Sequence, residues 1–270
     1  AGFARVGSTG GFDIEIRNDV VADGFSEGLN AAVASASGAI NTISSGTFND
    51  LQAQDIGTIS GTINAATAGI NSGTVGLLLA TEGATTSGLA AAAIGDTTVD
   101  VQIAGVDFAQ PIVQAGLDFG NVLQGSAQQS AIEISNAILN DAAFQDSLNA
   151  QFADAGVPPS GIEQLIGEIM GLAAGATDTS TMQIRLDTNS VGAVNATVTV
   201  ELESDGTAFG LGVTPLDSQN VLVEASITGS VGSLANPVVT PGGIDFGEFH
   251  ISAGSDSQGI DITNDIVIGE

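Results

Sequence analysis

The chain has 270 residues, of which 43% are hydrophobic and 4% aromatic, and it sets 31 acidic residues against three arginines (Arg5, Arg17 and Arg185) and no lysine. The formal net charge of -28 excludes nucleic acids and anionic membrane surfaces as partners, because both are bound through a basic footprint. It suits a saline or divalent-rich exterior, where counter-ions screen the repulsion, although a merely acidic, soluble protein is the alternative.

Sequence features that the chain lacks exclude further kinds of site and of protein. The chain has no Cys, so disulfides and thiolate metal sites are excluded. It has no apolar run of the roughly 20 residues that a membrane helix needs; "TVGLLLA" at 74–80 has only the length of a strand. The sequence begins at Ala1 without a methionine or a signal peptide, so we expect either a removed leader or a piece of something longer.

One strand-like phrase occurs three times along the chain. It reads "IEIRN" at 14–18, "IEISN" at 132–136 and "IDITN" at 260–264, and the copies are separated by the length of a whole domain. Behind the first two copies the agreement continues in the same order. "FSEGLNAAVA" from Phe25 matches "FQDSLNAQFA" from Phe144, and the stretch that begins at Thr74 then matches the stretch that begins at Thr197. An ordered series of matches indicates internal duplication.

The duplication predicts the domain organisation. We expect a first repeat over 1–110 with its first strand missing, a second repeat over 111–236, and the opening strands of a third over 237–270. The tail would then be a spare strand that can be donated to another chain.

Within the repeats the periodicity is that of strands. Val198, Val200 and Leu202 alternate with polar residues from Thr199 to Glu203, and turn sequences such as "SDGT" punctuate the pattern. Short strands separated by such turns predict an all-β fold of antiparallel β-sandwiches.

The segment "VPPSGIEQLIGEIMGLAAG" at 157–175 departs from this pattern. Ser160 and Glu163 form a capping box, and the apolar residues that follow have helical spacing: Ile162, Leu165, Ile166, Ile169 and Met170. We therefore predict one short helix over the end of the second sandwich, with this stripe in the core.

The repeat resembles Hydin-type immunoglobulin-like domains, and more closely the bacterial domains called choice-of-anchor D. The pattern Asp-Phe-Gly, a small strand, Gly, and a strand ending in Asn falls on Asp118, Phe119, Gly120, Gly125 and Asn136, and again on Asp245, Phe246, Gly247, Gly254 and Asn264. The resemblance implies tandem immunoglobulin-like β-sandwiches of large secreted bacterial surface proteins. We interpret each Phe as a core residue and each Asn as a residue that caps a turn. The resemblance does not imply catalysis.

The residues themselves also argue against an enzyme. The single histidine, His250, lies in a strand-like stretch, and nucleophile, phosphate-loop and zinc-protease motifs are missing. Glu201 and Glu203 share a predicted strand face, where we interpret them as solvated charges. Calcium is the one cofactor that the acids allow, and the weak candidates for its ligands are Asp205, Asp217 and Asp256.

We therefore expect an extracellular, cell-surface structural protein that forms a surface or biofilm-matrix fibre. Its copies would associate with one another, either as subunits joined by strand donation or as part of one long covalent array. For strand donation the expected interface residues are Ile244, Phe246, Phe249, Ile251, Ile260, Ile262 and Ile266. The alternative function is a calcium- or carbohydrate-binding adhesin region of a giant surface protein.

Overall fold

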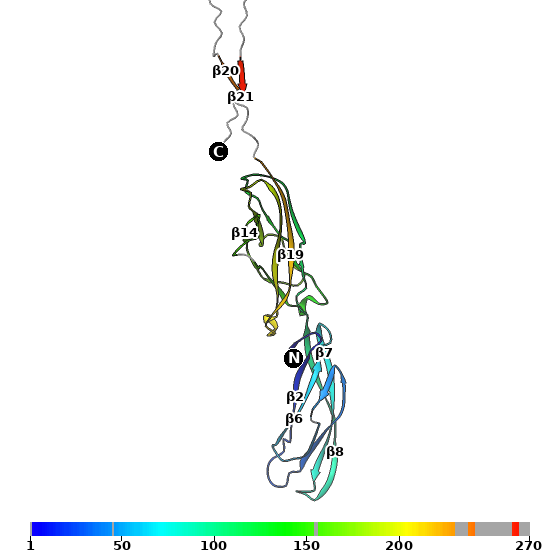
Figure 1. Cartoon of the computed structure of the whole chain (residues 1–270). Helices are drawn as coiled ribbons and strands as arrows, with labels where there is room; N and C mark the ends of the chain where they lie inside the picture. Colours follow the sequence, from blue (N-terminus) through cyan, green and yellow to red (C-terminus); the bar gives the residue numbers. More distant parts are fainter. Residues whose placement is uncertain (1, 45, 154–155, 230–236, 241–260, 265–270) are drawn as a thin grey trace, which may run out of the picture.

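Two β-sandwiches lie end to end in the computed structural model (Figure 1). The structure describes residues 2–44, 46–153, 156–229, 237–240 and 261–264. We call strands β1–β8 the N-terminal sandwich and strands β9–β19 the C-terminal sandwich, because described strands of one set form no ladder with the other set.

The N-terminal sandwich consists of β1 (Gly2–Arg5), β2 (Thr9–Arg17), β3 (Gly28–Gly38), β4 (Ile40–Ile43), β5 (Thr47–Leu51), β6 (Ile56–Asn64), β7 (Gly69–Gly83) and β8 (Leu89–Val106). A five-stranded sheet in the order β1-β8-β7-β3-β5 packs against a three-stranded sheet in the order β2-β6-β4. The core between them contains Ile14, Ile16, Leu29, Ala31, Ile59, Val75 and Leu77.

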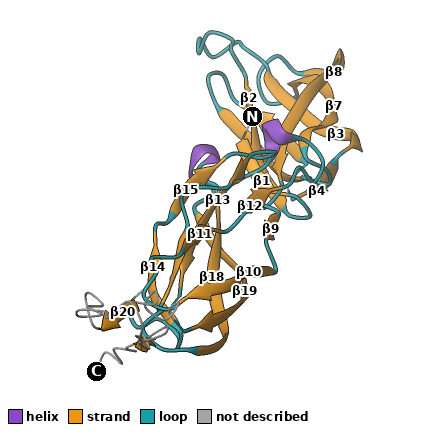
Figure 2. Cartoon of the chain, turned by 90° about the horizontal axis from the view of Figure 1, so that it is seen from above, coloured by secondary structure: helices purple, strands orange, loops and turns teal. Residues whose placement is uncertain are grey.

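The C-terminal sandwich is built from more and shorter strands: β9 (Pro111–Val113), β10 (Gly116–Leu123), β11 (Gln129–Ala131), β12 (Ile134–Asn136), β13 (Ser147–Phe152), β14 (Ile162–Ile166), β15 (Ile169–Leu172), β16 (Thr177–Asp178), β17 (Gln183–Leu186), β18 (Gly192–Asp205) and β19 (Val213–Thr228). Its large sheet has the order β10-β19-β18-β13-β15, and β11-β17-β14 and β16-β12-β9 cover it. Short 3-10 turns, η1 (Ala142–Phe144) and η2 (Thr207–Phe209), lie in its loops (Figure 2).

The all-β prediction is confirmed, and so is the alternation that suggested it. Val198, Val200 and Leu202 of β18 are buried, while Glu201 and Glu203 are exposed. Nearly all of the pairing is antiparallel, but β1 is parallel to β8 in the N-terminal sandwich, and β10 is parallel to β19 in the C-terminal sandwich.

The two sandwiches repeat each other down to single hydrogen bonds. Ser8 donates from its backbone N and its Oγ to the carbonyl of Arg5 at 3.0 and 2.6 Å, and Ser126 does the same to Leu123 at 3.1 and 2.6 Å. A glycine with positive φ precedes each serine, at Gly7 and Gly125.

The asparagine that ends each repeated strand bridges strands instead of only capping a turn. The Nδ2 of Asn18 donates to the carbonyls of Glu27 and Leu51 at 3.0 and 2.9 Å. That of Asn136 donates to the carbonyls of Asp146 and Leu172 at 2.9 and 3.0 Å. Both asparagines are buried.

A third pairing of the same kind begins in the tail. β20 (Pro237–Thr240) pairs with β21 (Asp261–Asn264), with Pro237 opposite Asn264 and Val239 opposite Ile262. In the C-terminal sandwich β9 pairs with β12 in this register, since Pro111 lies opposite Asn136. The backbone pairing of β20 with β21 thus has the register of β9 with β12.

The predicted helix over 157–175 is wrong. Residues 162–166 form β14, which pairs with β17, and residues 169–172 form β15, which pairs with β13. The reason is the glycine between them: Gly167 has φ +86°, and a Cβ there would lie 2.1 Å from the carbonyl oxygen of Thr181. A glycine also disfavours a helix by about 1 kcal/mol.

The core prediction for this segment is right for only part of it. Ile162, Leu165 and Ile169 are buried, but Met170 is 69% exposed. In a strand, neighbouring side chains point to opposite faces, so Ile169 and Met170 cannot both face the core as they would in a helix.

The first strand of the first repeat, which the sequence suggested was missing, is present in shortened form. β1 pairs only with 103–106 of β8, whereas β10 pairs with 222–228 of β19. In the matched registers, β1 corresponds to the second half of β10.

Candidate assembly site

The end of β8 connects the two sandwiches through a short backbone pairing. The N–H of Asp107 donates to the carbonyl of Phe144 at 2.9 Å, and the N–H of Asp146 donates to the carbonyl of Asp107 at 3.0 Å. The carboxylate of Asp107 accepts from the side chain of Asn140 at 2.8 Å. Asp107 directly follows β8 and is 4% exposed. The residue that leaves the N-terminal sandwich is therefore already buried against the C-terminal sandwich.

A buried ion pair closes this joint. The Nη1 of Arg5, on β1, lies 2.5 Å from the Oδ2 of Asp146, and the side chains are 17% and 0% exposed. Arg17 and Arg185 make longer and more exposed pairs, with Asp19 and Glu163. Exposed pairs of that kind contribute about 0–1 kcal/mol, but breaking a buried pair is far more costly.

Neighbouring groups hold the pair in place. Ser204 donates its hydroxyl to the carboxylate of Asp146 at 2.6 Å and accepts from the N–H of Ala109 at 2.8 Å. The guanidinium carbon of Arg5 lies 4.3 Å from the centroid of the Phe108 ring, a cation–π geometry.

The joint is also closely packed. A Cβ on Gly206 would lie 2.6 Å from the Nη2 of Arg5 and 2.9 Å from the Oδ1 of Asp146, so only glycine leaves room for the pair. The rings of Phe3 and Phe209 approach with centroids 5.2 Å apart. The sequence offered one signal for this site: Arg5 is one of three basic residues in a strongly acidic chain.

The N-terminal sandwich has an open edge on β8. Among the described residues, β1 covers only 103–106 of the strand, and β7 lies on its other side. The effect on the core is direct: Val99 and Val101 are half-buried, while their counterparts in β19, Val221 and Val223, are fully buried.

A second edge is open on β2. In the C-terminal sandwich β9 pairs with β12 on the side that β16 leaves free. In the N-terminal sandwich β2 pairs with β6, and no described strand takes the place of β9. Both open edges therefore lie at the positions that residues 111–119 fill in the C-terminal sandwich.

Most of the predicted interface residues lie outside the described residues: Ile244, Phe246, Phe249, Ile251, Ile260 and Ile266. The same is true of His250 and Asp256. Only Ile262 falls in a described strand, β21, opposite Val239.

The remaining calcium candidates do not form a cluster. The carboxylate of Asp205 accepts from the hydroxyl and the N–H of Thr207 at 2.6 and 3.0 Å, and these bonds lower its pKa. Asp217 borders an open hollow together with Glu201 and Glu203. In the described part of the chain no three acidic or histidine side chains are grouped so that they could hold a metal ion.

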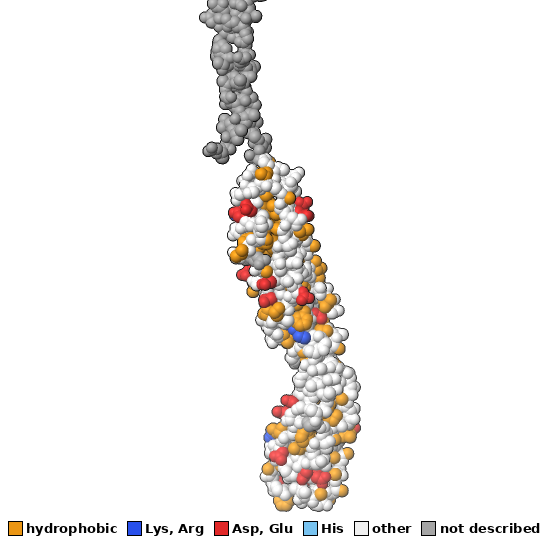
Figure 3. All heavy atoms as spheres, viewed as in Figure 1, with side chains coloured by type: hydrophobic (Ala, Val, Ile, Leu, Met, Phe, Trp, Pro, Cys, Tyr) orange, Lys and Arg blue, Asp and Glu red, His pale blue; other side chains and the backbone are white. Residues whose placement is uncertain are grey.

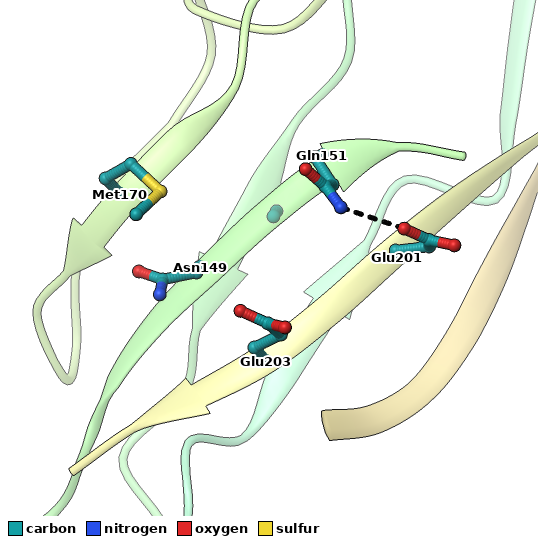
Figure 4. A pocket seen from close by; sticks show the side chains of 6 residues that line it. Asn149, Gln151, Met170, Glu201 and Glu203 are labelled. Carbon is teal, nitrogen blue, oxygen red and sulfur yellow. Dashed lines mark hydrogen bonds between the residues drawn. The ribbon is translucent and has the colours of Figure 1, made fainter. Parts of the chain in front are cut away.

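Glu201 and Glu203 also line a small hollow beside β13 (Figure 4). Its free volume is about 30 Å³, and Gln151 donates to Glu201 at 2.9 Å. The other residues that line it are Asn149, Ala150 and the exposed Met170. A hollow of this size has room for water.

Comparison with known proteins yields a likeness of fold. No protein-family model and no curated protein matches the chain, so the similarity to choice-of-anchor D domains stays a resemblance. The similar solved structures include an I-band fragment of titin (11% identity, 84% of this chain and 62% of that chain, TM-score 0.37) and the adhesive subunit of the CFA/I fimbria of enterotoxigenic Escherichia coli (11% identity, 73% and 72%, TM-score 0.32).

An endo-fucoidan hydrolase of glycoside hydrolase family 107 is also similar (12% identity, TM-score 0.26), and this chain spans only 28% of it. Since all these TM-scores lie below 0.5, the assignment of an immunoglobulin-like β-sandwich rests on the sheet topology above. Among the described residues, no helix is long and apolar enough to span a membrane.

Proposed function

We propose that this chain is an extracellular structural protein, a segment of a surface or matrix fibre made of immunoglobulin-like sandwiches laid end to end. The observation that carries the proposal is the joint. A buried ion pair, a backbone pairing and a ring contact hold successive sandwiches together, which suits a fibre that resists bending.

The surface charge supports an exterior location. Acidic side chains are scattered over both sandwiches on the face in Figure 3, and basic side chains are few. A net charge of -28 keeps copies apart at low salt, and screening at high salt lets them approach.

Two ways of linking copies fit this proposal. In the first, the tail of one chain adds a strand to the open edge of the N-terminal sandwich of the next, which gives a head-to-tail filament. In the second, the 270 residues belong to a longer covalent array, and the tail simply starts the next repeat.

Electron microscopy of the purified chain in molar salt, together with the mass of the native polypeptide, tests the proposal. Filaments one sandwich wide from a chain of 26.6 kDa support assembly from subunits. A native mass several times larger supports the covalent array. A native 26.6 kDa chain that stays monomeric at every salt and protein concentration contradicts the proposal.

A matched variant ends after Thr228, where β19 ends, and so keeps both sandwiches. We expect it to fold and to form no filaments. Filaments of normal length from this variant would exclude the tail as the link.

A further inference from the structure

We infer that residues 237–246 of a second copy fill both open edges of the N-terminal sandwich, in the register that 111–119 adopt in the C-terminal sandwich. The inference deepens the proposed fibre and rests on it. It specifies the partner, a second copy of this chain, and the register in which it binds.

In the C-terminal sandwich a single segment serves both sheets. β9 places Val113 opposite Ile134 of β12 in one sheet. β10 begins three residues after Val113, and it places Leu117 beside Val223 of β19 in the other sheet. Leu117 is 9% exposed and Phe119 packs against the core, so this segment closes the side of the sandwich.

The N-terminal sandwich offers the same two positions without an occupant in the described structure. The repeated phrase matches Ile16 of β2 with Ile134 of β12, and the strand registers match Val101 of β8 with Val223 of β19. An unpaired strand edge beside half-buried valines binds an added strand through backbone hydrogen bonds and apolar contact.

The tail carries a sequence that fits these positions. "PVVTPGGIDFG" at 237–247 matches "PIVQAGLDFG" at 111–120 with one extra residue in the connection. Val239 then corresponds to Val113, Ile244 to Leu117, and Phe246 to Phe119.

The backbone of the tail already pairs in the required register. β20 lies against β21, whose sequence "DITN" repeats the "EIRN" of β2 and its successor Asn18. Exchanging β21 for β2 would therefore place Val239 opposite Ile16 and Pro237 opposite Asn18. Pairing of β20 with β21 in the same chain is the competing state.

The length of the vacant edge also matches. Gly2 of β1 pairs with Ile103 of β8. The equivalent pair in the C-terminal sandwich is Gly120 with Ala225, by the register of β10 with β19. A donated strand that runs from Pro237 to Phe246 thus ends where β1 of the acceptor begins, and the two together span the edge that β10 spans alone.

Because the chain has no Cys, introduced thiols report the register without background. One preparation carries Ile16→Cys and the other Val239→Cys; they are mixed and oxidised, and disulfide-linked dimers are counted on a non-reducing gel. We expect efficient dimer formation. Val238→Cys replaces Val239→Cys as the control, since its side chain would lie on the opposite face and should cross-link at least tenfold less.

A second pair, Val101→Cys with Ile244→Cys, tests the other edge and guards against loss of the buried Ile16. Val113→Cys with Ile134→Cys in one chain is the positive control, since these residues are paired in the structure. Filaments without cross-links from either pair, or with equal cross-linking at 238 and 239, would overturn this register and leave the fibre standing. Cross-links from chains that form no filaments would support the register and contradict the fibre.

Discussion

Arg5 and Asp146 are 141 positions apart in the chain, and their side chains meet at 2.5 Å in the joint between the two sandwiches. The carboxylate has no exposed surface, and the guanidinium stacks on Phe108. The contact ties the first strand of one sandwich to a loop of the next, so the relative position of the sandwiches depends on it.

Arg5→Ala should weaken this joint because it leaves a buried carboxylate without its partner. Loss of one member of a buried pair costs about 3–5 kcal/mol. We expect calorimetry to show the C-terminal sandwich unfolding at a lower temperature. The double variant Arg5→Met with Asp146→Leu should recover much of the loss, since no charge is then left unpaired. A single variant with unchanged melting would contradict the structural role of the pair.

The two bridging asparagines should differ in importance. The side chain of Asn136 takes part in four hydrogen bonds: it donates to two carbonyls and accepts from the N–H of Gln110 and the side chain of Gln145. The side chain of Asn18 donates two, to the carbonyls of Glu27 and Leu51. Each buried group left unpaired costs about 1–3 kcal/mol. Asn136→Ala should therefore destabilise its sandwich more than Asn18→Ala does. Calorimetry suits the comparison, because the chain has no Tyr or Trp.

Gly167→Ala distinguishes a turn from a helix. In a helix this change would stabilise by about 1 kcal/mol. In the observed turn, a Cβ at φ +86° meets the carbonyl oxygen of Thr181, so the melting temperature should fall. Gly171→Ala is the matched control, because it has φ +69° but no atom within 4 Å of the added Cβ. An increase in stability for Gly167→Ala would contradict β14 and β15.

Asp178 should make the fold sensitive to acid. The backbone N–H of Thr181, and next that of Ser180, donate to its carboxylate and lower its pKa in the folded state. A lowered pKa means that the stabilisation is complete above the unfolded pKa, about 3.9 for aspartate, and is lost as the pH falls through the folded value. Asp178→Asn should flatten the melting temperature against pH below about 4. An unchanged acid slope would show that this loop does not contribute.

Sequence patterns predicted the sandwiches because apolar and polar residues alternate along a strand that buries one face, as they do from Val198 to Leu202. They failed at 157–175 because Ile162, Leu165 and Ile169 fit a helix as well as two short strands, and only the backbone at Gly167 decides between them. The joint could not be predicted, since Arg5 and Asp146 are brought together by the relative placement of the two sandwiches. The sequence did indicate the open edges, because the first copy of the repeat lacks the "DFG" that the second copy has.

The distance between the two sandwiches in solution tests the central claim, a joint that holds them in one arrangement. Spin labels on Ser72→Cys and Ser218→Cys, both exposed positions in a chain without cysteine, report it by double electron–electron resonance. We expect one narrow distance distribution that broadens in Arg5→Ala. A distribution that is already broad in the otherwise unaltered chain would contradict a locked joint and, with it, the stiff fibre.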